Sequence, residues 1–286
     1  MKGIILSAGK GTRLYPMTIP VCKSLLPVYD KPLIYYSLAT LMEAGINEIL
    51  IIVPPTRKQQ FIDLLGDGSN LGIHLEYKTQ ETPKGIADAF IIGKKFIGND
   101  KVCLILGDNI FYGDHFNEKL SRAVDLDKGA NVFGLWVNDP RAFGVVEFDN
   151  DGKAISIEEK PKKPKSNYII PGLYFYDNSV VDIASYLKPS ARGELEITDV
   201  NKEYLKREDL RVIELGEQLT WFDAGTEESL LIASNNIYKR QKKGKYIACI
   251  EEIAWKKGYI DKNQLRELGE ALNKTKYGQY LLSCLK

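Results

Sequence analysis

A short stretch near the start of the chain, residues 6–16, combines glycines, a hydroxyl group and cations in the manner of a phosphate-binding turn. It reads L-S-A-G-K-G-T-R-L-Y-P. Backbone N–H groups in such a loop can face phosphate oxygens, Thr12 can donate through its hydroxyl, and Arg13 offers a permanently charged fork. The other interpretation is a plain strand-to-helix turn whose glycines adopt unusual backbone angles. We favour a triphosphate ligand, because Lys10 and Arg13 would repel each other unless they shared an anion.

Two better-known phosphate motifs do not fit this turn. A dinucleotide-binding turn needs G-x-G-x-x-G, and Leu14 stands where the third glycine would be. A P-loop needs G-x-x-x-x-G-K-[ST], whereas Lys10 is followed by Gly11 and lacks a glycine at the required distance before it. The turn therefore predicts neither a dehydrogenase nor a P-loop kinase.

Two aspartates far apart in the sequence, Asp108 and Asp223, each follow an apolar run, in "VCLILGDN" and "TWFDAGT". If both runs end at one edge of a sheet, the two carboxylates meet beside the triphosphate. Mg²⁺ typically takes one or two protein carboxylates together with phosphate oxygens and water. Either residue alone could instead cap a helix or close a turn. We expect the pair to be the metal ligands.

Two lysines are candidates for further phosphate contacts. Lys23 lies in "VCKSLLP", and Lys160 follows Glu158 and Glu159 at the end of a predicted strand. A lysine can bind phosphate as a point charge, and a carboxylate can accept hydrogen bonds from sugar hydroxyls. The alternatives are a surface lysine whose stem covers apolar area and a solvated charge run. The two histidines lack metal-ligand spacing, and no Ser-His-Asp set is evident.

The first half of the chain alternates short apolar runs with amphipathic segments, which is typical of a parallel sheet covered by helices. We expect strands at 3–9, 47–55, 74–80 and 101–109, and helices at 33–45, 56–68 and 85–98. The glycine-rich turn and Asp108 then follow strands. Open α/β sheets bind ligands at that carboxyl edge.

The second half changes to longer β segments. These are 131–137, 144–161 and 168–177, with a hairpin turn predicted at 149–153. Helices are expected at 178–187 and 193–207, followed by a strand at 210–215. The tail after Glu227 looks wholly helical and lacks glycine-rich phosphate turns. The pattern predicts an α/β fold, with a catalytic domain at 1–227 and a helical region for packing and assembly at 228–286.

Composition argues against several classes of protein. Of 286 residues, 44% are hydrophobic and the net charge is +1, so no overall basic field would attract nucleic acid or an anionic membrane. The sequence has no signal-peptide pattern and no apolar span long enough for a bilayer. Its four cysteines are scattered and form no C-x-x-C pair. We expect a globular cytoplasmic protein.

Eight motifs, spread in order along the chain, together resemble the glucose-1-phosphate thymidylyltransferase family. They are G-x-G-T-R-L, K-x-L-L-P, L-G-D-N-I-F-Y-G, F-G-V-V-E-F, E-E-K-P-x-x-P-K-S-N-Y, G-L-Y-F-Y-D, R-G-E-L-E-I-T-D and W-x-D-x-G-T. The resemblance extends from Met1 to the C-terminal "YGQYLL", essentially the whole chain. It implies a Rossmann-like, mixed and mostly parallel sheet flanked by helices, with a C-terminal helical extension.

The resemblance also implies an activity. Family members transfer a deoxythymidylyl group from dTTP to α-D-glucose 1-phosphate with Mg²⁺, releasing pyrophosphate. This reaction begins dTDP-L-rhamnose and deoxysugar synthesis for cell-surface polysaccharides. The family forms homotetramers with a second, interfacial nucleotide site for dTDP-sugar feedback, built partly by the C-terminal helices. The alternatives are an enzyme that uses UTP or another hexose 1-phosphate, and a non-catalytic sugar-nucleotide sensor.

Site residues can be carried over position by position from the family motifs. Catalytic roles fall to Arg13, Lys23 and Lys160, and metal binding to Asp108 and Asp223. The nucleotide would be held by Leu6, Ser7, Ala8, Gly9, Gly11, Thr12, Arg13, Lys23, Ser24, Gln80, Gly85 and Asp108, with Gln80 and Gly85 on the base. The sugar phosphate would be held by Asn109, Gly144, Glu159, Lys160 and Ile170.

The sequence departs from the family pattern near these positions. Lys10 adds a cation to a loop that usually reads L-A-G-G-S-G-T-R-L. Ser24 replaces a common Gln, as does Asp88, and both bear on the choice between dTTP and UTP. Phe143 replaces a common Tyr and so removes one hydroxyl near the sugar.

Overall fold

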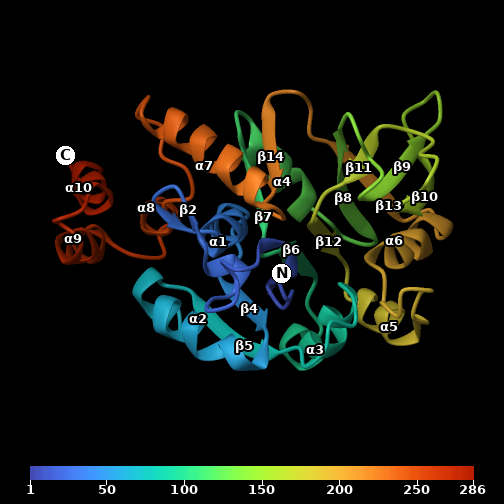
Figure 1. Ribbon diagram of the computed structural model, residues 1–286, viewed down its shortest axis with the longest axis horizontal. Coiled ribbons are helices and arrows are strands. Elements are labelled where there is room, and N and C mark those ends of the chain that lie inside the picture. Colours follow the sequence, from blue (N-terminus) through green and yellow to red (C-terminus); the bar gives the residue numbers. More distant parts are fainter.

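A computed structural model describes residues 1–286 of the chain. One ten-stranded sheet runs through the molecule in the order β10-β9-β11-β8-β12-β6-β1-β4-β5, and β13 pairs with β8 beside this path. Figure 1 shows helices on both sides of this sheet. The mixed α/β architecture predicted from the sequence is confirmed.

The strands from the first half of the chain form the parallel part of the sheet. They are β1 (Lys2–Leu6), β4 (Glu48–Val53), β5 (His74–Thr79) and β6 (Val102–Leu106). Alternate residues of these strands pack into two different hydrophobic clusters, Ile5 with α1 (Ile34–Glu43) on one face and Ile4 with α3 (Asp88–Ile97) on the other. Because both faces are covered, the strands are continuous apolar runs in the sequence.

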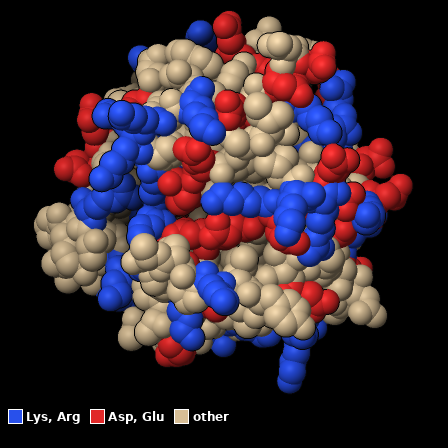
Figure 2. Space-filling view, turned by 90° about the vertical axis from the view of Figure 1, so that its right-hand side faces the viewer, with Lys and Arg blue, Asp and Glu red and all other residues tan.

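The strands from the second half are paired mainly antiparallel. They are β8 (Ala130–Trp136), β9 (Gly144–Phe148), β10 (Ala154–Glu159), β11 (Tyr168–Ile170), β12 (Leu173–Tyr176) and β13 (Leu210–Glu214). The predicted hairpin is confirmed between β9 and β10, with Gly152 at φ 77° in its turn. Seen from this end of the molecule, Lys and Arg side chains are mixed with Asp and Glu, and neither sign dominates the face (Figure 2).

Two small sheets lie apart from the main one. Strand β7 (Asn109–Gly113) pairs antiparallel with β14 (Leu219–Asp223), and β2 (Pro27–Val28) pairs with β3 (Lys31–Pro32). In the first pair, Asn109 lies opposite Asp223. This pairing brings the end of β14 to the exit of β6, so it positions the two predicted metal ligands.

The remaining helices are α2 (Lys58–Leu65), α4 (Phe116–Val124), α5 (Val180–Tyr186), α6 (Ile197–Lys206), α7 (Glu227–Gln241), α8 (Ile250–Lys256), α9 (Lys262–Ala271) and α10 (Lys276–Ser283). Short 3₁₀ turns occur at Thr12–Leu14, Lys23–Leu25, Pro55–Arg57 and Ser69–Leu71. No helix is long and apolar enough to cross a membrane. The tail predicted to be wholly helical after Glu227 contains α7 to α10, but residues 242–249 between α7 and α8 are not helical.

The C-terminal helices share the core of the sheet. Helix α8 packs against α1, and Ile253 of α8 belongs to the same hydrophobic cluster as Ile5 and Ile51. Helices α9 and α10 pack on each other and lie at the end of the molecule opposite β9 and β10 (Figure 1). The 1–227 and 228–286 division stays a prediction about function, with the two parts in contact.

Candidate active site

The glycine-rich turn leaves β1 at the carboxyl edge of the sheet. Ser7 and Ala8 are buried, and the N–H of Ser7 still bonds the carbonyl of Ile52. Residues 9–13 are exposed or half-buried, Gly11 adopts φ 63°, and the carbonyl of Gly11 accepts from the Thr18 hydroxyl at 2.7 Å. The turn therefore presents its backbone to solvent next to the strand ends, as a phosphate cradle requires.

The most concentrated charge at this edge is a lysine between two carboxylates. The Nζ of Lys23 lies 2.5 Å from an Asp108 carboxylate oxygen and 3.9 Å from one of Asp223. Lys23 is itself buried. The structure thus brings together three residues that were singled out from distant parts of the sequence.

Asp223 has an unusual affinity for its proton. Burial and then the charge of Asp108 raise its pKa to about 6, against the opposing effects of Lys23, Arg13 and Lys160. Of these three cations, Lys23 lies within ion-pair distance of the Asp223 carboxylate. A carboxylate that is poorly solvated and repelled by a neighbour gains from an added cation.

The carboxylate of Asp108 is held in position by its neighbour. The side-chain nitrogen of Asn109 donates to Asp108 at 2.9 Å, while its oxygen accepts from Trp221 Nε1 at 2.7 Å and Gly172 N at 3.1 Å. Asn109 is buried and largely committed to these bonds. Contact between Asn109 and a sugar phosphate stays a prediction.

Asp108 and Asp223 fit a hard divalent cation. One oxygen of each carboxylate lies within 4 Å of Lys23 Nζ, and the two negative charges repel each other. A bound cation would reduce this repulsion. No group of three or more potential His, Cys, Asp or Glu ligands occurs in the structure. The two carboxylates therefore suit a cation whose other ligands are phosphate oxygens and water, and do not suit a closed protein cage.

A cavity of about 390 Å³ lies beside this carboxylate pair, and all five predicted sugar-phosphate residues line it. Its lining includes Arg13, Asp108, Asn109, Gly144, Glu159, Lys160, Ile170 and Asp223. Lys160 has φ 43°, a left-handed conformation that costs a non-glycine residue energy and clusters at functional sites. Its Nζ lies 3.5 Å from Glu159, so cation and carboxylate share the cavity wall.

Sequence reasoning missed a second set of charged residues in the same cavity. Arg192 binds Glu196 at 2.9 Å and reaches Glu159 at 3.4 Å, and Thr198 donates a short hydrogen bond to Glu159. The segment 193–207 was expected to be helical throughout, but α6 begins at Ile197, because Glu196 is extended. Residues 192–196 instead form a loop over the cavity. In the sequence their alternating charges look like a solvated surface.

Trp221 was also missed as a site residue. Its indole lines the cavity and packs edge-on against Phe143, with ring centroids 5.3 Å apart. The position of the aromatic residue two before Asp223 was the only signal in the sequence.

The two predicted base-binding residues, Gln80 and Gly85, lie outside the 390 Å³ cavity. Gln80 lines a cavity of about 250 Å³ together with Ala8, Gly9 and Lys10. Gly85 has φ 100°, and a side chain there would meet the backbone of Leu195, so glycine is required. Ser24 is buried beside Gly107, next to the hydroxyl of Ser7. Of the predicted nucleotide residues, Ala8, Gly9 and Gln80 line the 250 Å³ cavity. Arg13 and Asp108 line the 390 Å³ cavity instead, and the others line neither.

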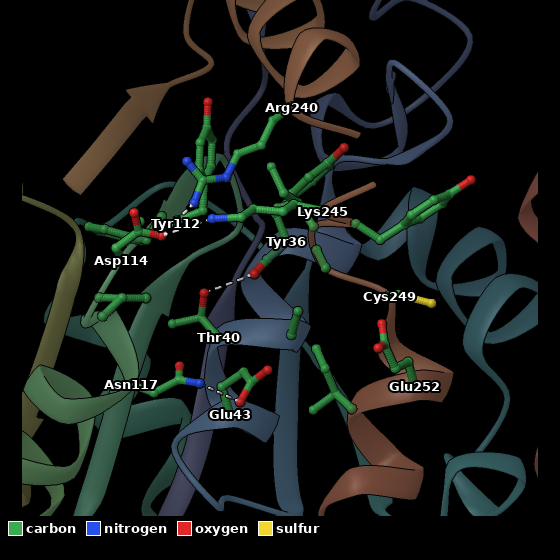
Figure 3. A pocket seen from close by; sticks show the side chains of 18 of the residues that line it. Tyr36, Thr40, Glu43, Tyr112, Asp114, Asn117, Arg240, Lys245, Cys249 and Glu252 are labelled. Carbon is green, nitrogen blue, oxygen red and sulfur yellow. Dashed lines mark hydrogen bonds and ion pairs between the residues drawn. The ribbon is translucent and has the colours of Figure 1, made fainter. Parts of the chain in front are cut away.

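A third, larger cavity of about 680 Å³ lies elsewhere, between α1, β7 and the start of the C-terminal region. Figure 3 shows Arg240 and Lys245 on one side of it, both within ion-pair distance of Asp114 (3.0 and 3.7 Å). The Arg240 guanidinium lies over the ring of Tyr112, and Tyr246 and Tyr280 also line the space. The cavity combines cations and aromatic rings.

Comparison with known proteins identifies the family of the chain. A family model described as nucleotidyl transferase matches residues 2–240. Glucose-1-phosphate thymidylyltransferases from Neisseria meningitidis serogroup A and Mycolicibacterium smegmatis are each 54% identical, over 100% of this chain and 100% and 99% of theirs. A Bacillus anthracis protein described as a glucose-1-phosphate thymidylyltransferase, crystallised with sucrose, is 44% identical with a TM-score of 0.77. The match covers 82% of this chain and 94% of that one.

The full-length match agrees with the fold and with the order of motifs along the chain. Members of this family act on a nucleoside triphosphate and a sugar phosphate and generally need a divalent metal. The chain belongs to the nucleotidyl transferase family and, within it, to the glucose-1-phosphate thymidylyltransferases.

Proposed function

We propose that the protein transfers the deoxythymidylyl group of dTTP to α-D-glucose 1-phosphate, giving dTDP-glucose and pyrophosphate. The observation that carries the proposal is Lys23 held between Asp108 and Asp223, with the glycine-rich turn on one side and the Lys160 cavity on the other. Two anionic substrates can approach that point from the two hollows. The relatives' names supply the base and the sugar.

The reaction requires no nucleophile from the protein. A phosphate oxygen of glucose 1-phosphate is already anionic and attacks the α-phosphorus of the triphosphate in line, while pyrophosphate leaves on the opposite side. The barrier is the repulsion between two anions and the charge that builds on the leaving group. Catalysis therefore rests on positioning and on fixed charge.

The residues of this chain divide those tasks. Lys160 holds the attacking phosphate beside Glu159, and Lys23 offsets charge between the reacting phosphates. Arg13, which acts on Asp223 from the turn, stabilises the departing pyrophosphate. Bound Mg²⁺, with Asp108 and Asp223 as its protein ligands, supplies Lewis-acid stabilisation of phosphate charge.

A substrate panel tests the proposal. Pyrophosphate release is measured with dTTP, UTP and other triphosphates against glucose 1-phosphate and other hexose 1-phosphates. The highest kcat/KM is expected for dTTP with glucose 1-phosphate. A higher value for UTP or another sugar would replace the substrate assignment, and no turnover with any pair would favour a non-catalytic sensor.

The metal assignment has its own test. Chelation with EDTA should abolish pyrophosphate release, and Mg²⁺ should restore it. The double variant Asp108→Asn, Asp223→Asn should not respond to Mg²⁺. Full magnesium-dependent activity in that variant would contradict the site.

We further propose that the 680 Å³ cavity of Figure 3 binds a dTDP-sugar feedback ligand in a homotetramer. Arg240 and Lys245 suit a diphosphate, and the tyrosines suit a base or sugar ring. Leu231 and Ile232 are exposed on α7, an apolar surface available for assembly. The substrates and the four free thiols favour a cytoplasmic enzyme.

Inhibition by dTDP-rhamnose tests the feedback site. It should not be competitive with dTTP, and Lys245→Ala should weaken it while leaving uninhibited turnover unchanged. Lys239→Ala, at an α7 position outside the cavity lining, is the control. Competitive inhibition would remove the second site, and a monomer in equilibrium sedimentation would remove the assembly.

A further inference from the structure

The side-chain amide of Gln80 is held by a residue to which family resemblance assigns no role. Gln80 Nε2 lies 2.8 Å from an Asp88 carboxylate oxygen and 3.4 Å from the carbonyl oxygen of Gly85. Both Gln80 and Asp88 are buried, each with 7% of its surface exposed. Asp88 therefore forms a buried contact directly behind the predicted base-binding residue.

This contact determines which end of the amide faces outward. The oxygen and nitrogen of a glutamine amide are distinguished by their hydrogen-bond partners. A carboxylate and a carbonyl can only accept, so the nitrogen must face Asp88 and Gly85. The two amide hydrogens are then directed at these two acceptors.

The Gln80 oxygen remains as the free polar group. No donor within the chain bonds it, and the enclosed polar atoms without a partner are Ser7 Oγ and Gln60 Oε1, so the Gln80 oxygen is reachable from outside. Gln80 lines the 250 Å³ cavity next to the glycine-rich turn. Whatever base enters that cavity meets an acceptor.

The position of Asp88 in the fold strengthens the arrangement. Asp88 is the first residue of α3, and the amino end of a helix favours negative charge there. An ionised aspartate has no hydrogen to donate, whereas the Gln common at this position in the family could present either end to Gln80. The aspartate removes that freedom.

Building on the function proposed above, we propose that Asp88 is a positioning residue for base selection. It fixes Gln80 so that only the amide oxygen faces the base, which selects a pyrimidine carrying a hydrogen on N3, as thymine and uracil do. Cytosine presents a lone pair at N3, and two acceptors facing each other leave both unpaired. Thymine and uracil are not distinguished by this contact.

The test compares dUTP with dCTP, which differ only at N3 and C4 of the base. Wild-type enzyme should use dUTP with a kcat/KM on the order of 100-fold higher, since dCTP leaves the buried Gln80 oxygen and its own N3 without a hydrogen bond. In Asp88→Asn the Gln80 amide can reverse, and this preference should fall by about tenfold. Asp88→Glu keeps an acceptor-only partner and should retain more of the preference than Asp88→Asn.

Asp182→Asn is the matched control, because Asp182 also lies in the first turn of a helix but is exposed. It should retain the wild-type preference. An unchanged preference in a folded Asp88→Asn enzyme would overturn the inference. If the variant does not fold, equal use of dUTP and dCTP by the wild-type enzyme overturns it instead. Absence of turnover with dTTP would refute the proposed function itself and is a separate outcome.

Discussion

At the scale of single residues, Asp223 shows how a site can oppose the stability of its own fold. Its pKa is raised to about 6 by burial and by Asp108, above the ordinary value of an aspartate. The proton-bound form is therefore favoured in the folded state. The stabilisation from this proton is complete below about pH 4 and is lost as the pH rises through about 6.

Replacing Asp223 with Asn should separate stability from activity. Without metal or nucleotide, Asp223→Asn should be more stable than wild type at pH 7, on the order of 1 to 3 kcal/mol, and the difference should shrink toward pH 5. Urea unfolding in EDTA at both pH values measures this. The same variant should lose most of its turnover. A stability difference that does not change with pH would contradict the assigned shift.

Lys160 should act mainly on one substrate. Lys160→Ala should raise KM for glucose 1-phosphate while changing KM for dTTP little. If the charge-assisted contact of Lys160 strengthens in the transition state, its loss raises the activation free energy by about 2 to 4 kcal/mol. Initial rates with each substrate varied separate the two effects. An equal rise in both KM values would place Lys160 outside the sugar-phosphate site.

The side-chain hydroxyl of Ser7 should prove dispensable for stability. Its buried hydroxyl has no hydrogen-bond partner and lies against Gly107, where a side chain would come within 1.9 Å of it. Ser7→Ala removes an unsatisfied group and should leave unfolding free energy unchanged or increase it by up to about 1 kcal/mol. Chemical denaturation measures it. A loss of more than about 1 kcal/mol would mean that the hydroxyl has a partner.

The sequence predicted residues whose position follows from a strand end. Asp108 and the turn after Leu6 leave adjacent strands, so the carboxyl-edge rule places them correctly. The loop carrying Arg192 was missed, because its hydrogen bonds to Glu196 and Glu159 are tertiary and its charges resemble a solvated run. The hydrogen bond between Gln80 and Asp88 was missed for the same reason, because it too depends on the tertiary fold.

At the scale of elements, the short strand β14 and helix α7 act as one unit behind the carboxylate pair. Thr226 caps α7, accepting from the N–H of Ser229 at 3.2 Å, while the Ser229 hydroxyl accepts from the N–H of Thr226 at 3.0 Å. Only two residues separate this cap from Asp223. The start of the helix therefore fixes the end of the strand that carries the carboxylate.

Loss of the Thr226 cap should affect both the stability of the protein and its activation by Mg²⁺. Thr226→Ala should cost about 1 kcal/mol of unfolding free energy, the usual value of an N-cap hydroxyl. It should also weaken Mg²⁺ activation, because the chain after Asp223 is less constrained. Thermal unfolding and a Mg²⁺ titration of turnover test both. Thr275→Ala, which removes the cap of α10 far from the site, should affect stability alone.

The pairing of β7 with β14 was the main element-level feature that the sequence did not predict. The residues of β14 lie in the run "TWFDAGT", but β7 was not predicted as a strand, and nothing local specifies that Trp221 should reach Asn109, 112 residues away. The parallel strands were easier to place, because their continuous apolar character shows that both faces are buried. Long-range strand pairs lack such a mark.

At the scale of the whole molecule, the C-terminal helices belong to the same core as the sheet. Ile253, Leu265 and Leu281 share one hydrophobic cluster with Ile5 and Ile51. Removing residues 242–286 would expose one face of that cluster. The helices are therefore required for the catalytic part even if their own role is assembly.

Truncation tests this dependence. A chain ending at residue 241 should be insoluble, or its free energy of unfolding should be several kcal/mol lower than that of the full chain. The reason is that burying each large apolar side chain contributes roughly 1.5 to 3 kcal/mol. Circular dichroism during heating, compared with the full chain, measures it. A truncated protein with wild-type stability and full turnover would show that residues 242–286 form an independent appendage.

The antiparallel pair of β7 and β14 has a consequence for synthesis of the protein. Asp108 and Lys23 are made early, but their second carboxylate arrives only with the end of β14. A ribosome-bound chain that has not yet released this segment cannot assemble the pair of carboxylates. Transfer activity should therefore emerge late and abruptly during translation, long after the parallel half of the sheet has had the chance to fold.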